Sequence, residues 1–199
     1  MAQIVVPFRG ESGKQRLDVP EELRATLALA MLGDVLTAGV ATGRTLLVTG
    51  DTAARELGSE LGAELVDDPG GGQGPAVAAA LEQVENGVVL VLNADVPCVV
   101  PHDLRTFAGA AELGAFGLVE AEDGTTNALA LPRASLFAPL YGAGSADRFR
   151  AHAEARGVAA VAAAIPNLAD DVDTLEDLAK IGLRAGPRTQ TAIGRLPGL

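Results

Sequence analysis

Short, unbroken apolar runs alternate with longer segments of mixed polarity along most of this chain. The run at 87–92 is rich in β-branched residues, which is typical of a strand buried on both faces of a parallel sheet. Similar patterns predict strands at 3–7, 46–49 and 65–66. Helices are predicted at about 21–37, at about 52–61 with Asp51 as the cap residue, and at 76–84. This alternation implies right-handed crossovers and a three-layer α/β/α sandwich with a mostly parallel sheet.

The pattern changes after residue 115. Apolar segments at 116–120 and 127–131 flank Asp-Gly-Thr-Thr at 123–126, and Asp-Gly between two apolar segments signals a turn. We therefore expect at least one strand here to run antiparallel, which makes the sheet mixed. The remaining elements predicted are a helix at about 146–156, an apolar run at 158–165 and a helix that begins near Thr174.

The end of the chain differs from the rest in charge. We divide the chain into a domain at 1–182 and a basic tail at 183–199 that contains Gly, Pro and Arg. No acidic residue from 183 onward opposes the last cationic side chains, which are Lys180, Arg184, Arg188 and Arg195. The tail is expected to be either mobile or docked on the acidic body or on a second subunit, and a homodimer is plausible.

The composition of the chain restricts the kinds of ligand that it is expected to bind. Of the 199 residues 48% are hydrophobic but only 3% are aromatic, so Ala, Val and Leu must build the core. The net charge of −11 argues against a nucleic-acid surface, because phosphate backbones need clustered Lys and Arg. An acidic protein can still bind a nucleotide through local cations, backbone N–H groups and a metal ion.

Other features predict a cytoplasmic protein with no membrane partner. The single cysteine, Cys98, cannot form an intrachain disulfide, which is consistent with a reducing compartment, and we interpret it as a small buried side chain. No stretch of about 18 uncharged apolar residues predicts a membrane span. The N-terminus lacks the basic start and apolar run of a signal peptide.

Asp95 is the first candidate functional residue. It ends the apolar strand in the run Asn-Ala-Asp-Val-Pro at 93–97, and ligands bind at the carboxyl ends of strands in open α/β sheets. A carboxylate there is a hard oxygen ligand suited to holding Mg²⁺ against a phosphate. The alternative is an aspartate that only caps a turn.

Two glycine-containing loops are candidate phosphate sites. The first, at 9–17, carries Lys14 and Arg16, but its spacing matches neither a Walker A loop nor a dinucleotide fingerprint. The second, at 70–74, precedes a helix whose N-terminal amides suit an anion or a base edge. The alternatives are a solvated basic loop and a flexible surface loop.

Two further clusters admit two interpretations each. Asp171 and Asp173 point the same way if the backbone there is extended, and paired carboxylates repel unless a cation lies between them. Helix capping by Asp173 or Thr174 is the alternative. Ser145, after Gly-Ala-Gly at 142–144, is either an N-cap or part of an oxyanion cradle; His102 and His152 receive no catalytic role.

These motifs occur in an order that resembles the guanylyltransferases acting on 2-phospho-L-lactate or phosphoenolpyruvate in biosynthesis of the deazaflavin coenzyme F-420. The resemblance rests on the segments 14–17, 70–74, 93–97, 123–129, 142–145 and 171–174, and extends to the tail at 186–189. It implies the Rossmann-like mixed sheet of the molybdenum-cofactor nucleotidyltransferases and nucleotide-diphospho-sugar transferases. It also implies Mg²⁺, GTP as substrate, and a downstream transferase that uses an unstable product.

The resemblance assigns roles by position. Asp95, Asp171 and Asp173 would be the metal ligands. Asp95, Lys14 and Arg16 would be the catalytic residues, with the two cations at the nucleotide phosphates. The nucleotide loops would use Arg9, Gly10, Gly72, Gln73 and Gly74, the last two near the base. Thr126, Gly142 and Ser145 would cradle the phosphorylated acid.

The first loop departs from the family pattern. Phe8 and Arg9 replace an expected lysine position, and Glu11 adds a negative charge. Gly-Gln-Gly-Pro at 72–75 stands where the family has Gly-Leu-Asn or Gly-Leu-Gly, which weakens the case for GTP in particular. Two alternatives therefore stay open: nucleotidyl transfer to a molybdopterin or sugar phosphate, and a noncatalytic nucleotide-binding module. The sequence does not separate phosphoenolpyruvate from phospholactate or phosphoglycerate.

Overall fold

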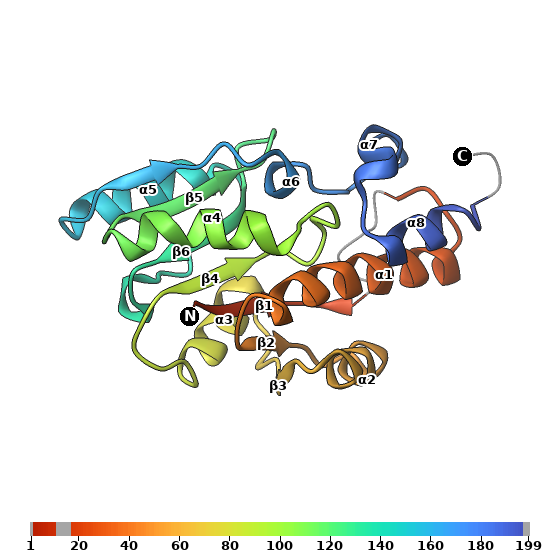
Figure 1. The fold of residues 1–199 in the computed structure, drawn as a ribbon, viewed down its shortest axis with the longest axis horizontal. Helices are drawn as coiled ribbons and strands as arrows, with labels where there is room; N and C mark the ends of the chain where they lie inside the picture. Colours follow the sequence, from red (N-terminus) through yellow and green to blue (C-terminus); the bar gives the residue numbers. More distant parts are fainter. Residues whose placement is uncertain (1, 11–16, 197–199) are drawn as a thin grey trace.

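A seven-stranded mixed sheet forms the centre of the protein in a computed structural model that describes residues 2–10 and 17–196 (Figure 1). Its strands are β1 (Gln3–Pro7), β2 (Thr45–Val48), β3 (Glu64–Val66), β4 (Val89–Leu92), β5 (Phe116–Glu120), β6 (Thr126–Leu131) and β7 (Ala160–Ala162). Their spatial order is β3-β2-β1-β4-β6-β5-β7. Strand β6 pairs antiparallel with both β4 and β5, whereas the other pairs are parallel. The predicted mixed α/β sheet and its antiparallel segment are confirmed.

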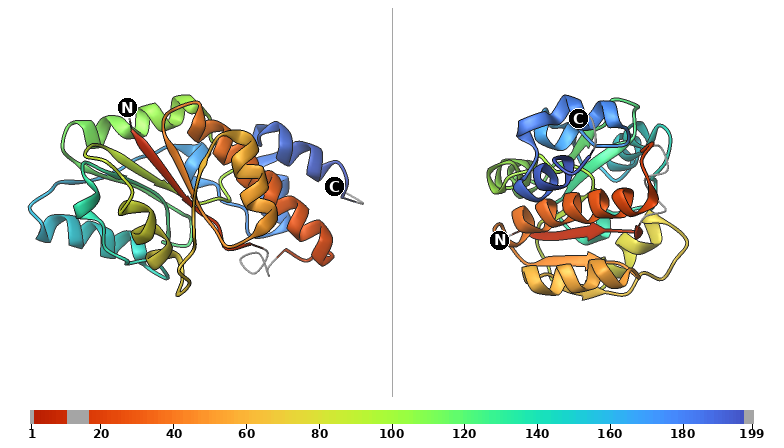
Figure 2. Two further views of the ribbon diagram at one scale, coloured as in Figure 1. Left: turned by 90° about the horizontal axis from the view of Figure 1, so that it is seen from below. Right: turned by 90° about the vertical axis from the view of Figure 1, so that its right-hand side faces the viewer.

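Helices cover both faces of this sheet, as Figure 2 shows. On one face lie α1 (Glu21–Val40), α2 (Thr52–Leu61), α4 (Pro101–Glu112) and α6 (Pro166–Ala169). On the other lie α3 (Gln73–Leu81) and α5 (Ser145–Ala155). Alternate strand residues serve the two layers: Ile4 packs with the first set of helices and Val5 with the second, and both are fully buried. A central strand buried on both faces needs apolar side chains toward both layers, which is why residues 4–6 show no alternation.

Several element boundaries differ from the predictions. Helix α3 begins at Gln73, three residues before the expected start, so the last glycines of the loop lead straight into it. Strand β4 ends at Leu92, and Asp95 lies in the turn beyond it. Asp51 caps α2 as predicted, with its carboxylate accepting a hydrogen bond from Ala54 N at 2.8 Å.

The interpretation of Ser145 as an N-cap is wrong. The cap residue of α5 is Gly144, whose φ of +67° lies in the left-handed region, and Ser145 is the first helical residue. Its side chain makes no capping bond because its hydroxyl is paired with Thr126 instead. Thr174 does cap α7 (Leu175–Ile181), as one of the two alternatives held.

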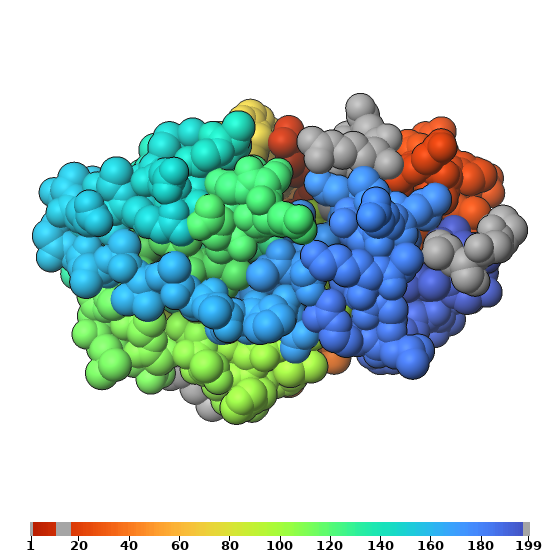
Figure 3. Space-filling view, turned by 90° about the horizontal axis from the view of Figure 1, so that it is seen from above, coloured from red at the N-terminus to blue at the C-terminus, as the bar shows by residue number. Residues whose placement is uncertain are grey.

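A third apolar cluster joins the C-terminal segment to α1. Leu27 and Met31 of α1 pack with Leu178 and Ile181 of α7 and Ala192 of α8 (Pro187–Ile193), and all are buried. Figure 3 shows the C-terminal segment running along this face of the molecule toward α8. The described part of the basic tail is therefore docked on the body of the protein.

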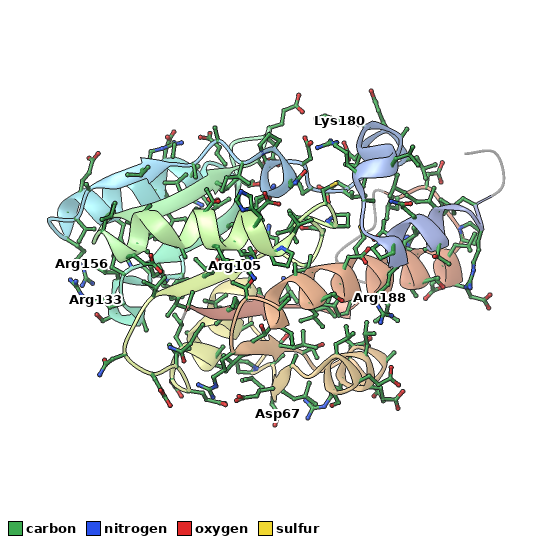
Figure 4. All side chains as sticks on the ribbon, in the orientation of Figure 1. Asp67, Arg105, Arg133, Arg156, Lys180 and Arg188 are labelled. Carbon is green, nitrogen blue, oxygen red and sulfur yellow. The ribbon has the colours of Figure 1, made fainter. Side chains whose placement is uncertain are left out.

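Acidic partners for the basic side chains come from elsewhere in the chain. Asp170 accepts from Arg184 at 2.6 Å and lies 3.2 Å from Lys180, which also reaches Glu122. Figure 4 labels Lys180 on α7 and Arg188 on α8, beside α1. Two of the four cations that looked unopposed along the sequence, Lys180 and Arg184, are thus paired with carboxylates in space.

Helix α1 has the length and hydropathy of a possible membrane span, with a mean hydropathy of 1.5. In the protein 56% of that window is buried, against the sheet, α2 and α8. A helix packed between a sheet and other helices needs the same apolar composition.

Candidate active site

Three carboxylates converge at the carboxyl end of β4. Asp95, Asp171 and Asp173 each offer an oxygen, and the three oxygens lie within 4.8 Å of one another. Mg²⁺ takes oxygen ligands at about 2.0–2.1 Å, so opposite ligands on one ion lie roughly 4 Å apart. All three side chains are half-buried. The donor chemistry and spacing therefore fit a hard divalent cation.

The local backbone explains why these carboxylates meet. Val172 N donates to Asp95 O at 3.0 Å, which ties the segment after α6 to the turn after β4. Val172 is fully buried in the third apolar cluster. Because neighbouring side chains in an extended segment point to opposite sides, burial of Val172 turns Asp171 and Asp173 together toward Asp95.

A pocket of about 180 Å³ opens beside Asp95. Its walls come from the end of β1, from α1, from the start of α3 and from the turn after β4, and include Arg9, Gly10, Gln73, Asn93 and Asp95. Gly10 of the first loop and Gln73 of the second, 63 residues apart in sequence, thus line one cavity with a candidate metal ligand. This arrangement suits part of a nucleotide next to a cation.

The second glycine loop has a conformation that depends on glycine. Gly70, Gly71 and Gly72 have φ values of +79°, +80° and +111°, which L-residues with a Cβ rarely adopt. A Cβ on Gly74 would lie 2.5 Å from Cβ of Pro139, so the backbone of α3 approaches that segment closely. The loop delivers Gln73 to the pocket at the N-terminus of a nine-residue helix.

Side-chain amides lie between this pocket and the carboxylates. Gln73 Nε2 donates to Asn93 Oδ1 at 2.7 Å, and Asn93 Nδ2 donates to Asn127 Oδ1 at 3.3 Å. Asn127 Nδ2 donates in turn to Asp171 Oδ1 at 3.1 Å. Sequence reasoning assigned no role to Asn93 or Asn127. The available sequence signal was an asparagine followed by an apolar run at 128–131, in a segment predicted to be a strand; in the structure Asn127 is 1% exposed.

The residues expected to cradle the acid substrate lie together but are buried. The hydroxyls of Thr126 and Ser145 are 2.9 Å apart, and these residues are 2% and 0% exposed. The Ser145 N–H donates to Gly142 O. The Arg148 guanidinium holds this loop by donating to the carbonyls of Leu140, Tyr141 and Ala143. In this structure the hydroxyl pair joins β6 to α5.

An acidic pocket of about 270 Å³ lies next to Asp171 and Asp173. Lys180 is the cation among its lining residues. Burial by itself raises the pKa of Asp170, but hydrogen bonds from Arg184 and Lys180 outweigh it and hold that pKa below its usual range. Asp170 is therefore charged and engaged in ion pairs, which separates it from the three converging carboxylates.

Cys98 follows the Asp95 turn and is 2% exposed. Burial raises the pKa of its thiol, although Arg184 acts in the opposite direction. The prediction of a small buried side chain is confirmed. Lys14 and Arg16, the expected phosphate contacts, lie outside the described residues.

Comparison with known proteins gives consistent results. A family model for the MobA-like NTP transferase domain matches residues 22–164. Phosphoenolpyruvate guanylyltransferase of Streptomyces scabiei is 38% identical, over 97% of this chain and 96% of that protein. The Geodermatophilus obscurus protein of the same name is 35% identical, over 89% of this chain and 83% of its own length.

Solved structures agree on the fold. A protein of Desulfovibrio desulfuricans G20 assigned as a nucleotide-diphospho-sugar transferase superposes with a TM-score of 0.78 at 16% identity, covering 97% of this chain and 94% of that one. A nucleotidyl transferase from Methanothermobacter superposes with a TM-score of 0.66 at 21% identity, covering 91% and 95%. At these identities the likeness extends to the fold alone.

Proposed function

Because this chain belongs to the MobA-like NTP transferase family and to the family of its phosphoenolpyruvate guanylyltransferase relatives, it is a nucleotidyltransferase, and we propose that it joins the GMP moiety of GTP to phosphoenolpyruvate. The observation that carries this proposal is the convergence of Asp95, Asp171 and Asp173 beside a pocket built from two glycine-containing loops.

The proposed reaction needs no general base. An oxygen of the substrate phosphate attacks the α-phosphorus of GTP, the bond from that phosphorus to the bridging oxygen breaks, and pyrophosphate leaves with the electron pair. The attacking oxygen is already an anion, so the protein must chiefly position the reactants and offset their charges.

The chain's own residues divide this work. Asp95, Asp171 and Asp173 would hold Mg²⁺, which supplies charge neutralisation between two anionic substrates when bound. Arg9, Gly10 and the loop that ends at Gln73 would hold the nucleotide in the pocket. Lys14 and Arg16 would stabilise the departing pyrophosphate, with Arg as a fork and Lys as a point charge.

We propose that Thr126, Gly142 and Ser145 form the site for the acid. Because the two hydroxyls bond to each other, direct contact with the acid requires that pair to open. The alternative acceptors are 2-phospho-L-lactate, a molybdopterin and a sugar phosphate.

The test is pyrophosphate release with GTP and Mg²⁺ against phosphoenolpyruvate, 2-phospho-L-lactate and 3-phosphoglycerate, with the downstream transferase present to consume an unstable product. ATP, CTP and UTP serve as nucleotide controls. Release with GTP and phosphoenolpyruvate supports the proposal, and release with another acid reassigns the acceptor. GTP binding without release for any of the acids would overturn the proposed reaction.

The cellular setting is part of the same proposal. We place the enzyme in the cytoplasm, in coenzyme F-420 biosynthesis, upstream of a transferase that uses its product. A homodimer is proposed as well, and its test is the solution mass by light scattering.

A further inference from the structure

A continuous set of hydrogen bonds crosses the candidate active site from the nucleotide pocket to the carboxylates. It joins Gln73, Asn93, Asn127 and Asp171, which we call the polar relay, with donor–acceptor distances of 2.7, 3.3 and 3.1 Å. The relay links the start of α3, the turn after β4, the start of β6 and the segment after α6. These members are separated by 20, 34 and 44 residues in sequence.

Groups that can only accept hydrogen bonds fix the direction of the relay. Asn127 Nδ2 donates to the carbonyl of Ala169 at 3.1 Å as well as to Asp171. Neither a carbonyl nor a carboxylate can donate, so the Asn127 amide has one orientation, with its oxygen toward Asn93. Asn93 Nδ2 likewise donates to Thr126 O at 3.3 Å, which leaves its oxygen to accept from Gln73.

Burial gives these bonds their importance. Asn127 is 1% exposed, and Asn93, Gln73 and Asp171 are half-buried. In such surroundings a hydrogen bond is stronger than in water, and an unsatisfied polar group is costly. A residue that hydrogen-bonds to a metal-binding side chain orients that side chain and changes the affinity of the site for the ion.

We propose that Asn127 is the positioning residue that fixes the Asp171 carboxylate for a divalent cation, and that Asn93 connects this contact to Gln73 in the nucleotide pocket. The inference rests on the proposed metal site, but it does not depend on which acid or nucleotide is the substrate. Asn127 acts through Asp171 and touches neither substrate in this proposal.

The test uses Mn²⁺ alone as the probe, measured by titration calorimetry on the full-length protein without nucleotide. Asn127→Ala is expected to weaken Mn²⁺ binding about 10-fold to 100-fold, the usual effect of losing a residue that orients a metal ligand. Asp95→Asn should also weaken binding, which places the ion at these carboxylates. The matched control is Asn167→Ala, because Asn167 Nδ2 donates to the Asp103 carboxylate at 3.0 Å outside the site.

The outcomes separate the relay from the proposed reaction. Mn²⁺ affinity in Asn127→Ala equal to that in Asn167→Ala would overturn the positioning role, whatever the activity assay shows. Failure of the wild-type protein to bind Mn²⁺ would overturn the relay together with the metal site. Weaker Mn²⁺ binding in Asn127→Ala than in Asn167→Ala, in a protein that releases no pyrophosphate, supports the relay and contradicts only the reaction.

A measurement on the wild-type protein covers the case in which Asn127→Ala does not fold. In NMR spectra of protein labelled with ¹⁵N-asparagine, Mg²⁺ should shift the side-chain amide resonances of Asn127. The reason is that a bound cation withdraws charge from the Asp171 carboxylate, which accepts the hydrogen bond of that amide. The Asn167 amide should not respond. Unchanged Asn127 resonances at saturating Mg²⁺ would contradict the proposal.

Discussion

Asp34 holds the C-terminal helix on the body of the protein, and its removal should cost several kcal/mol of stability. This side chain of α1 is 5% exposed, and its two oxygens accept from Arg188 N at 3.1 Å and from Thr189 N at 2.8 Å. Both donors are in the first turn of α8, where backbone N–H groups have no partner within the helix. A negative charge at that end of a helix is also favourable.

The magnitude follows from these two bonds. A hydrogen bond to a charged group contributes about 1.5–3 kcal/mol, so two would give roughly 3–6 kcal/mol. Asp34→Ala also removes the cost of burying a carboxylate, and the hydrogen bond of Arg188 N is only partly buried, so water can reach that donor. We therefore expect a loss of about 3 kcal/mol, which for a chain of this size lowers Tm by roughly 6–12 °C.

Gly186→Ala tests the same contact from the other side. The φ of Gly186 is −63°, which alanine adopts without strain, but a Cβ there would lie 2.3 Å from Cγ of Asp34. The added methyl group should displace the carboxylate and destabilise the protein. Because both substitutions disturb one contact, the double variant should lose less stability than the sum of the single losses.

The assays are urea unfolding followed by circular dichroism, and hydrogen exchange resolved to residues 187–196. Exchange in α8 should accelerate more than exchange in the strands, because a seven-residue helix does not persist without its tertiary contacts. The control is Asp147→Ala, which removes an exposed carboxylate paired with Arg150 and should change stability by less than about 1 kcal/mol. Stability of Asp34→Ala equal to that of the control, with unchanged exchange in α8, would refute this reasoning.

Three further outcomes are expected. Asp95→Asn should fold normally but lower turnover at least ~100-fold, which is the scale of losing one key electrostatic contact. The control is Asp67→Asn, at a carboxylate that is 91% exposed, and its turnover should not change. A soluble Asp95→Asn enzyme with near-normal turnover would refute the role of Asp95. The pKa of Asp170 is lower in the folded protein than its ordinary value of about 3.9, so its contribution to stability is present above that pH and is lost as the pH falls through the folded value. Urea unfolding across a pH series should therefore show that the stability advantage of the wild type over Asp170→Asn shrinks in acid, and a constant difference would contradict the ion-pair argument. Cys98, whose pKa is raised by burial, should react with an aromatic disulfide reagent far more slowly in the native protein than in urea, and equal rates would show that the thiol is accessible.

The sequence by itself determined the strands, the class of fold and the candidate carboxylates. Strand and helix periodicities are local properties, so the apolar run before Asp95 and the Asp-Gly turn at 123–124 were enough to predict a mixed sheet. The prediction that the Asp171 and Asp173 side chains point the same way was also local, because it needed only an extended backbone between them. The start of α3 was predicted three residues too late, because the helix begins at Gln73 behind the N-cap residue Gly72, whose φ of +111° composition does not reveal.

Only the tertiary structure decided which of these residues lie together and which hydrogen bonds connect them. Asn127 and Asp171 are 44 residues apart, and Asp34 and Thr189 are 155 apart. Neither contact leaves a periodic signal, because each depends on where strands and helices cross and not on the spacing along one element. The same reason explains why Lys180 and Arg184 looked unopposed in sequence and are paired in space with Asp170 and Glu122. Local pattern fixes the elements, whereas the buried polar contacts between them depend on how the chain packs.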